Sequence, residues 1–300
     1  DTNHMSQSSF GNKFKVTTWG ESHGKALGAV IDGCPAGLPL CEEDIQKFLD
    51  RRKPGQSRYT TARKEGDLVE ILSGVFEGKT TGTPISLMVR NTDQRSRDYG
   101  NIAYSYRPGH ADYTFDQKYG FRDYRGGGRS SGRETIGRVA AGAIASKILE
   151  ELGISICTYT RSIGPVEIAS FNKEEIHQNA FYMPDAQAAV KAGEYLEECM
   201  KNQDSAGGVI ECRITGTPAG LGEPVFDKLS ALLAHALMSI GAVKAVEIGD
   251  GIAVTSSNGS TDNDGFTVKD GEIIKTSNHA GGIMGGISDG SEIILRAHIK

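Results

Sequence analysis

The 300-residue sequence contains no uninterrupted apolar stretch of the roughly 18 residues needed to cross a bilayer. Its five cysteines form no Cys-x-x-Cys pair and have no regular spacing, which argues against a disulfide framework. We therefore expect reduced thiols in a cytosolic protein that has no membrane partner. The formal net charge of −5 argues against a general nucleic-acid binder, although a local basic site is compatible with it.

Two common phosphate-binding signatures are also absent. There is no Gly-Lys-Ser/Thr of a Walker A loop, and no Gly-x-Gly-x-x-Gly follows a predicted strand. Glycine itself is abundant, since 39 of 300 residues is 13%, against about 7% in average proteins. This excess indicates tight turns, or backbone that approaches a ligand closely.

The hydrophobic pattern alternates between strand and helix periods and predicts an α+β fold. In each half, strands precede an apolar helix and further strands follow it, which indicates a duplicated unit. Residues 1–4 read as a cloning remnant before Met5, so residues 5–300 are expected to form a single domain. We predict strands at 13–18, 27–31, 68–76, 85–90, 154–160, 166–169, 208–215, 245–248, 251–255 and 292–299, and helices at 42–50, 131–148, 185–200 and 226–240.

Positive charge is concentrated in two loops of this acidic protein. Residues 51–64 include six basic residues and no acid, and residues 95–133 include eight basic residues against four acids. Arginine suits phosphate and carboxylate because its planar fork bonds two oxygens at once. The two loops together favour a pocket for an anion, while each alone is also compatible with a solvated run of charge.

A glycine run opens the clearest predicted helix. Gly126–Gly128 precedes Ser131 and Glu134, which fit a capping box at the helix start. Free N–H groups, the helix dipole and the lack of side chains make such a turn suitable for holding an anion. We interpret this segment as part of the same anion site.

Three histidines occupy glycine-bounded turns: His23, His110 and His279. Histidine is the side chain best suited to give or take a proton near pH 7. We expect proton transfer from His23 and His110, because both lie beside charged residues near the predicted anion site. A metal site formed by the three histidines is an alternative, but no His-x-x-x-His or dense acid cluster supports it, and we expect no metal.

Nine segments resemble chorismate synthase in order and spacing, over about Gly11 to Lys300, and the spacing is similar to the bacterial form. They are Gly20–Gly24, Arg51–Gly55, Asn91–Ser96, Arg107–Asp112, Tyr124–Ser131, Pro218–Asp227, His235–Ile240, Glu247–Gly251 and Ser277–Gly282. The resemblance implies a sandwich with a central helical layer between antiparallel sheets, pseudo-duplicated and assembled as a homotetramer. It also agrees with the two-halves pattern above.

The activity implied by this resemblance is that of a carbon–oxygen lyase acting on phosphates. 5-Enolpyruvylshikimate 3-phosphate loses phosphate and a ring hydrogen in a 1,4-anti elimination and becomes chorismate, the last step of the shikimate pathway. The family requires reduced FMN (FMNH2), although the reaction has no net redox change. The flavin is reduced either by the protein with NAD(P)H or by an external reductant, and bacterial members mostly use the latter.

The resemblance also implies roles for individual residues. His110 matches the histidine that keeps the reduced flavin in its correct protonation state, and His23 matches the one that protonates the departing phosphate. The matches to substrate-anion ligands are Arg52, Arg58, Arg107 and Arg133. The matches to flavin contacts are Arg129, Ser130, Ser131, Gly241, Ala242, Gly285 and Lys300, with Gly241 standing where the family often has Asn.

The family pattern continues past the position of Lys300 with a Pro-Thr/Ser segment and an Arg-His-Asp-Pro stretch that carries further flavin contacts. Weak flavin binding is the expectation for a chain that lacks them. Two alternatives in other classes remain open. One is a non-catalytic anion-binding module, and the other is a metal-dependent phosphohydrolase that uses the three histidines of the glycine turns.

Overall fold

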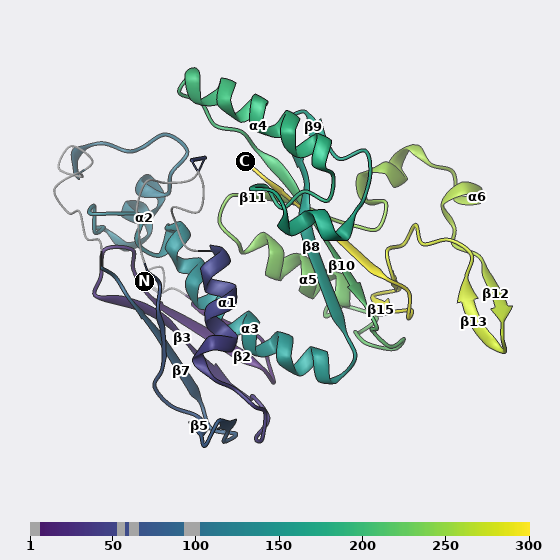
Figure 1. The fold of residues 1–300 in the computed structure, drawn as a ribbon, viewed down its shortest axis with the longest axis horizontal. Coiled ribbons are helices and arrows are strands. Elements are labelled where there is room, and N and C mark those ends of the chain that lie inside the picture. Colours follow the sequence, from purple (N-terminus) through teal and green to yellow (C-terminus); the bar gives the residue numbers. More distant parts are fainter. Residues whose placement is uncertain (1–6, 53–57, 60–65, 93–102) are drawn as a thin grey trace. The chain divides into compact units, whose positions relative to one another are not determined.

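The computed structural model describes residues 7–52, 58–59, 66–92 and 103–300 (Figure 1). These residues form two compact units, Asp1–Ile148 and Leu149–Lys300, and each unit is described by itself below. The interpretation of residues 1–4 as a remnant lies outside the described residues, as do Lys53, Arg63, Lys64 and Arg95 of the basic loops. The single domain expected for residues 5–300 stays a prediction.

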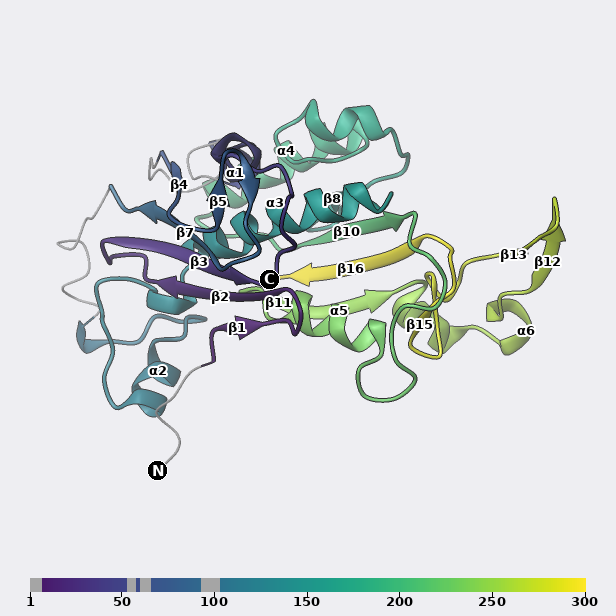
Figure 2. The same cartoon turned by 90° about the horizontal axis from the view of Figure 1, so that it is seen from below.

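The first unit contains a five-stranded antiparallel sheet (Figure 2). Its strand order is β1 (Ser9–Phe10), β2 (Lys15–Gly20), β3 (Ala26–Asp32), β7 (Ile85–Arg90) and β4 (Val69–Ile71). Alternate residues of the central strands are buried, among them Leu27, Ile31 and Leu87. This period of two gives the sheet one apolar face, which needs a helical cover.

Helices α1 (Glu42–Arg52) and α3 (Thr135–Glu151) contribute to the same hydrophobic core as that face. The small residues of α3 allow close packing: a Cβ at Gly137 would stand 2.8 Å from Thr18 Cγ2 and 2.9 Å from the Gly28 carbonyl oxygen. A side chain at position 137 would therefore push the helix away from β2 and β3. The unit is completed by β5 (Val75–Phe76), β6 (Lys79–Thr80), α2 (Asp112–Tyr119) and the 3-10 turns η2 (Gly128–Ser130) and η3 (Gly132–Glu134).

The second unit contains another five-stranded antiparallel sheet. Its order is β11 (Val243–Ile248), β16 (Ile293–Ile299), β10 (Gly208–Thr215), β8 (Ser155–Ile163) and β9 (Val166–Glu167). Helix α5 (Leu229–Met238) packs with Leu229, Leu233 and Leu237 against Ile293 and Leu295 of β16. Helix α4 (Ala186–Lys201) packs against the end of the sheet formed by β8 and β9.

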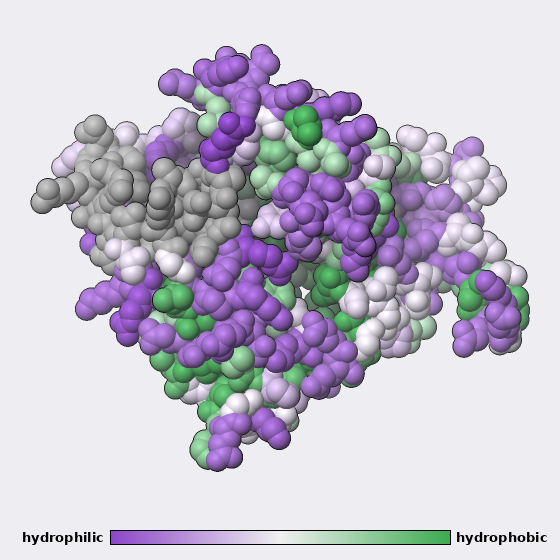
Figure 3. Space-filling view, in the orientation of Figure 1, coloured by the Kyte–Doolittle hydropathy of each residue, from purple (hydrophilic) through white to green (hydrophobic). Residues whose placement is uncertain are grey.

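Smaller elements extend from this second sheet. They are η4 (Lys173–His177), η5 (Gly251–Ser256), α6 (Gly259–Asp262), β12 (Phe266–Lys269), β13 (Glu272–Lys275), β14 (Ile283–Met284) and β15 (Ile287–Ser288). The β12–β13 hairpin exposes Phe266, Val268 and Ile273 among charged side chains, as Figure 3 shows at its right edge. Within the described ranges, no helix is long and apolar enough to cross a membrane.

Two antiparallel sheets, each with its own helix, confirm the α+β class and the duplicated pattern predicted from the sequence. The strand predicted at 251–255 is wrong, because this segment forms the turn η5. The Glu247 side chain accepts a hydrogen bond from the Ile252 N–H at 2.8 Å, and this bond draws the backbone out of an extended path. The capping box is half formed: Ser131 accepts from the Arg133 N–H at 3.2 Å, but Glu134 instead bonds Thr18 and Arg138, and α3 begins at Thr135.

Candidate functional site

The first unit contains a cavity of about 390 Å³ beside its glycine run. The lining residues are Glu21, His110, Ala111, Asp112, Phe115, Tyr119, Phe121, Arg122, Asp123, Gly126, Gly127, Gly128 and Arg129. All but Glu21 come from the segment 110–129, which runs from the His110 turn through α2 to η2. The structure thus brings the predicted glycine turn, one predicted histidine and one predicted flavin-binding arginine to one cavity.

His110 is held in this cavity by an ion-pair network. Its Nδ1 lies 2.9 Å from Asp112 Oδ1 and 3.1 Å from a terminal nitrogen of Arg107. Arg107 donates to both carboxylate oxygens of Asp112, through Nε at 2.8 Å and a terminal nitrogen at 2.7 Å. The Arg107 hydrogen bonds hold the pKa of Asp112 well below its usual range. Asp112 therefore stays ionised and fixes the orientation of the imidazole.

His23 has a different environment. Strand β2 ends at Gly20, whose positive φ of 89° starts the turn that carries the histidine. The His23 Nδ1 lies 3.2 Å from the Ser22 hydroxyl oxygen. A Cβ at Gly126, which lines the cavity, would collide with Nδ1 and with Ser22 Oγ, so this glycine permits the close approach. His23 thus lies against the glycine run, with the Ser22 hydroxyl bonded to its ring.

Two of the predicted anion-binding arginines share one buried carboxylate. Arg52 donates to Asp67 Oδ2 at 2.8 Å and Arg133 donates to Asp67 Oδ1 at 3.1 Å. The Asp67 side chain has no exposed surface, and Arg133 is 5% exposed. Arg133 also donates through Nε to Asn91 Oδ1 at 3.0 Å. Its remaining terminal nitrogen is buried and has no hydrogen-bond partner among the described residues, so a donor is left for an acceptor from outside the chain.

The other predicted arginines of this unit are placed separately. Arg58 is exposed and donates to the Tyr59 hydroxyl at 2.7 Å. Arg129 reaches back to β2, where it donates to the Gly20 carbonyl at 3.0 Å and to the Thr18 hydroxyl at 2.6 Å. Ser130 is exposed at the end of η2. The Arg129 side chain therefore fixes the glycine turn to the sheet, with the serine next to it facing solvent.

Four predicted flavin contacts lie in the second unit, and all are exposed: Gly241, Ala242, Gly285 and Lys300. Two of them are joined, because the Lys300 N–H donates to the Ala242 carbonyl at 3.0 Å. A side chain at Gly241 or Gly285 would meet nothing within 4 Å. Space for the asparagine that the family often has at position 241 is thus available in this unit.

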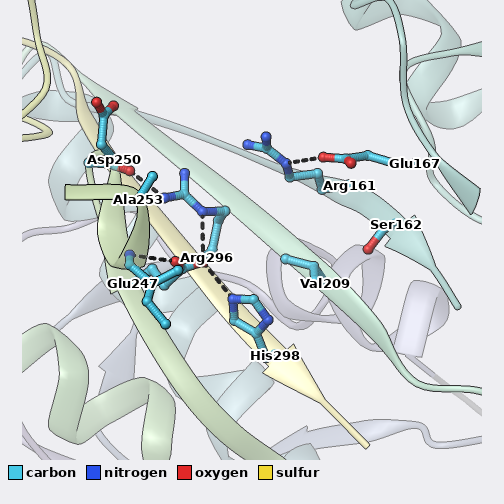
Figure 4. Close-up of a pocket in the computed structure, with 11 residues that line it drawn as sticks. Arg161, Ser162, Glu167, Val209, Glu247, Asp250, Ala253, Arg296 and His298 are labelled. Atoms are coloured by element: carbon cyan, nitrogen blue, oxygen red, sulfur yellow. Dashed lines mark hydrogen bonds and ion pairs between the residues drawn. The ribbon is translucent and has the colours of Figure 1, made fainter. Parts of the chain in front are cut away.

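The second unit has its own polar cavity of about 470 Å³, and no sequence-predicted site residue lines it (Figure 4). Charged groups in its wall pair with one another: Arg161 with Glu167 at 3.1 Å, and Glu247 with Arg296 at 3.2 Å and with His298 at 2.6 Å. The predicted third histidine, His279, belongs to this unit but does not line the cavity. Three acids, Glu167, Glu247 and Asp250, line this cavity against two arginines, which makes the cavity a poorer candidate for an anionic ligand.

Sequence reasoning missed the two carboxylates that organise the first-unit site. Asp112 stands within the Arg107–Asp112 segment, so its closeness to His110 was a readable signal. Asp67 lies 15 positions from Arg52 and 66 from Arg133, and no local pattern links the three. Asp67 is the second of two acids, after Glu65, that follow the basic loop, and this position was the only hint of its role.

The comparisons with known proteins all point to one family. The family described as chorismate synthase matches residues 14–300. This chain is 66% identical to a chorismate synthase of Agathobacter rectalis, covering 99% of this chain and 81% of that protein, and 66% identical to one of Lachnoclostridium phytofermentans, covering 99% and 82%. A crystal structure of chorismate synthase has a TM-score of 0.82 and 34% identity, covering 96% of this chain and 84% of that one.

Proposed function

Because the chain belongs to the chorismate synthase family, we propose that the cavity of its first unit is where 5-enolpyruvylshikimate 3-phosphate and reduced FMN react. The chain is a carbon–oxygen lyase that acts in the shikimate pathway, in which this substrate becomes chorismate. The observation that carries the proposal is the His110–Asp112–Arg107 network at the wall of a glycine-lined cavity.

The elimination has a simple balance. The C–O bond to phosphate breaks and the phosphate leaves with the electron pair, while a C–H bond breaks and its electrons complete the new double bond. There is no net oxidation or reduction. The chain must therefore hold one phosphate and two carboxylates, place a proton donor near the leaving group and exclude water.

Arginines meet the first requirement. We assign the substrate anions to Arg52, Arg58, Arg107 and Arg133. The buried, unsatisfied terminal nitrogen of Arg133 supports its part in this assignment, since an anion would supply the missing acceptor. Asp67 and Asp112 hold three of these guanidinium groups before the substrate arrives. Such preorganisation lowers the cost of ordering long side chains on binding.

The residues present also fit a planar, anionic cofactor. Phe115, Tyr119 and Phe121 give the cavity aromatic lining, and Gly126–Gly128 adds backbone without side chains to it. The volume of about 390 Å³ falls within the usual range for ligand sites. Arg129, Ser130 and Ser131 would hold FMN from this unit. The family resemblance also assigns flavin contacts to Gly241, Ala242, Gly285 and Lys300 of the second unit, and these stay predictions. The chemistry that a bound reduced flavin supplies is transient electron donation to the substrate.

The two histidines divide the proton chemistry between them. His110, oriented by the ionised Asp112, would maintain the proton on the cofactor side, because a fixed carboxylate selects which ring nitrogen faces the cavity. His23 would deliver a proton to the departing phosphate. Its ring lies against the glycine run that lines the cavity, which is a suitable place from which to give a proton to a leaving group.

The oligomeric state and the cellular location are inferred from the family resemblance. We propose a homotetramer in the cytoplasm, with no nucleic-acid or membrane partner. Size-exclusion chromatography with light scattering tests the tetramer.

The proposed function is tested with purified protein, FMN, a chemical reductant and 5-enolpyruvylshikimate 3-phosphate. We expect chorismate and phosphate in equal amounts and no net consumption of reduced flavin. His110→Ala and His23→Ala should each lower turnover by about 10² or more. The exposed His177 of η4 provides the matched control, and His177→Ala should leave turnover unchanged.

Three outcomes contradict parts of this assignment. Near-wild-type turnover in both histidine variants removes their proton-transfer roles. Phosphate release without flavin that stops on addition of EDTA favours the phosphohydrolase. Binding of substrate without any turnover favours the anion-binding module.

A further inference from the structure

The second unit brings together one imidazole and two carboxylates that the proposed elimination does not use, and one of them, Asp250, also lines the polar cavity of this unit. Asp250, Asp262 and His279 each offer one ligand atom, and these three atoms lie within 4.8 Å of one another. Asp250 follows β11, Asp262 ends α6, and His279 lies in the turn after β13. The three residues are separated by up to 29 positions in the sequence, so the fold alone assembles them.

The backbone fixes two of these residues without help from a ligand. The Asp250 N–H donates to the His279 carbonyl at 2.9 Å. The preceding Gly249 has φ 61°, and a Cβ there would collide with the same carbonyl. Asp264 accepts from the N–H groups of His279 and Ala280 at 2.8 and 3.0 Å, and it is itself anchored by Lys275 at 3.1 Å. The turn that presents His279 is thus held from both sides.

The side chain of Asp262 supplies a second, independent observation. Its Oδ1 atom is shielded from solvent and accepts no hydrogen bond from any described residue. This oxygen has lost its water without gaining a hydrogen bond, although Asp262 as a residue is partly exposed, and an unpaired polar atom of this kind is costly. The His279 Nδ1 lies 2.6 Å from Asp250 Oδ2, so the other two groups already face one another. A cation between the three would satisfy the unpartnered oxygen.

We propose that Asp250, Asp262 and His279 form a binding site for a divalent cation of the Zn²⁺ class. An imidazole with two carboxylates is a donor set for zinc-like ions, whereas Ca²⁺ and Mg²⁺ take oxygen ligands. Three protein ligands leave the fourth tetrahedral position to water. Zinc ligands stand about 3.4 Å apart. The three ligand atoms lie within 4.8 Å of one another, so binding needs shifts of about an ångström, and His279 Nδ1 and Asp250 Oδ2, at 2.6 Å, must separate if both are ligands.

Asp250 and Asp262 give the site two negative charges, and these charges attract a cation. The cation would join the segments after β11, α6 and β13 at one point, which is a structural role independent of the elimination reaction.

The three-histidine metal site considered from the sequence is a different proposal. It used His279 together with two histidines of the first unit, whereas the present site uses two acids that the sequence pattern did not single out. Its ligands all belong to the second unit.

The test uses protein treated with EDTA, dialysed, and titrated with Zn²⁺ in a calorimeter. We expect one equivalent to bind at this site. Asp262→Asn and His279→Gln should each weaken binding at least about tenfold. The control variants Asp270→Asn and His177→Gln should keep native affinity, because Asp270 lies at the tip of the β12–β13 hairpin and His177 in η4, outside the cluster.

A second readout separates this site from the thiols and from misfolding. Co²⁺ in place of Zn²⁺ should give ligand-field absorption without a thiolate charge-transfer band, which excludes the free cysteines as ligands. Zn²⁺ should raise the melting temperature of the native protein and of both control variants. It should not change the melting temperature of either cluster variant. In EDTA, the native protein and all four variants should melt at the same temperature. No bound equivalent in the native protein, native affinity in both cluster variants, or a thiolate band would each overturn the proposal.

Discussion

Glu211 in the second unit and Asp67 in the first are both carboxylates buried between arginines, and they hold different kinds of structure together. Glu211 lies in the middle of β10, directly opposite Tyr159 of β8 and Arg296 of β16. It accepts hydrogen bonds from Tyr159, from Arg161 at 2.5 Å and from Arg296 at 3.2 Å. Asp67 joins the end of α1 to the turn η3, two segments that share no strand ladder with each other.

The difference shows what a buried charge can be used for. Around Glu211 the backbone ladder already fixes the strands, so the charge network reinforces their register, in which a slip of one residue would turn every side chain to the wrong face. Around Asp67 there is no ladder, and the carboxylate itself sets where Arg52 and Arg133 stand. The Glu211 network therefore supports stability, and the Asp67 network supports the geometry of the proposed substrate site.

Removing the Glu211 charge gives the largest expected effect. Burial alone would raise the pKa of Glu211, but the bonds from Tyr159, Arg161 and Arg296 outweigh it and lower the pKa, so the group is ionised in the fold. Glu211→Gln removes the buried counter-ion that Arg161 and Arg296 share, leaving each arginine only its less buried partner, Glu167 or Glu247. It should lower the free energy of unfolding by about 3–5 kcal/mol. Urea denaturation measures this change.

The matched control for this variant is Glu167→Gln, which removes the other carboxylate of Arg161. Glu167 is 59% exposed, so its loss should cost less than about 1 kcal/mol. Equal losses in the two variants would show that burial does not distinguish the two ion pairs.

Asp67→Asn should act mainly on substrate binding. Asp67 has a positive φ of 46°, a conformation that asparagine adopts readily, so the backbone is retained. Loss of the charge releases Arg52 and Arg133 from their shared partner. A charge-assisted hydrogen bond contributes about 1.5–3 kcal/mol, so we expect the substrate KM to rise about tenfold or more, measured by steady-state phosphate release.

The split between KM and kcat separates this effect from general damage. A rise in KM with kcat retained supports a positioning role for Asp67. A similar rise in the substrate KM in Glu211→Gln would show that the two networks do not differ in their effect on substrate binding.

A smaller, pH-dependent effect is expected at Glu247. Burial opposes ionisation, yet the Ile252 N–H, His298 and Arg296 together lower the pKa of Glu247 to about 2. Because the pKa is depressed in the fold, its contribution is present above the unfolded value of about 4.3 and is lost as pH falls from there toward 2. Glu247→Gln should lower unfolding free energy at pH 7 by on the order of 1 kcal/mol and flatten the acid limb of the stability curve.

Chemical denaturation at a series of pH values measures how the free energy of unfolding of Glu247→Gln depends on pH. Glu70→Gln is the control, since it removes a half-exposed carboxylate paired with the exposed Arg90 and should change stability at pH 7 by less than about 1 kcal/mol. An acid limb in Glu247→Gln that keeps its wild-type slope would contradict the assignment.

Local sequence signals predicted the parts of the fold that local physics decides. The strand at 208–215 and the helix capped by Asp185 were readable, because side-chain alternation and an N-cap act within a few residues. The strand predicted at 251–255 was wrong because the Glu247 side chain, five positions earlier, accepts a hydrogen bond from the Ile252 N–H. The Asp67 network was invisible because its partners meet only after the chain has folded. Family motifs located His23 and His110, but the carboxylate that orients His110 emerged from the geometry.

The order of strands in the second sheet has a consequence for synthesis on the ribosome. Strand β16 lies between β10 and β11, yet it follows every other strand of that sheet in the sequence. Until β16 emerges, β10 and β11 each present an unpaired edge, and the Arg296 partner of Glu211 is missing. The first unit can close while the nascent chain still holds these open edges, which are the places where a chaperone would bind and where premature association would begin.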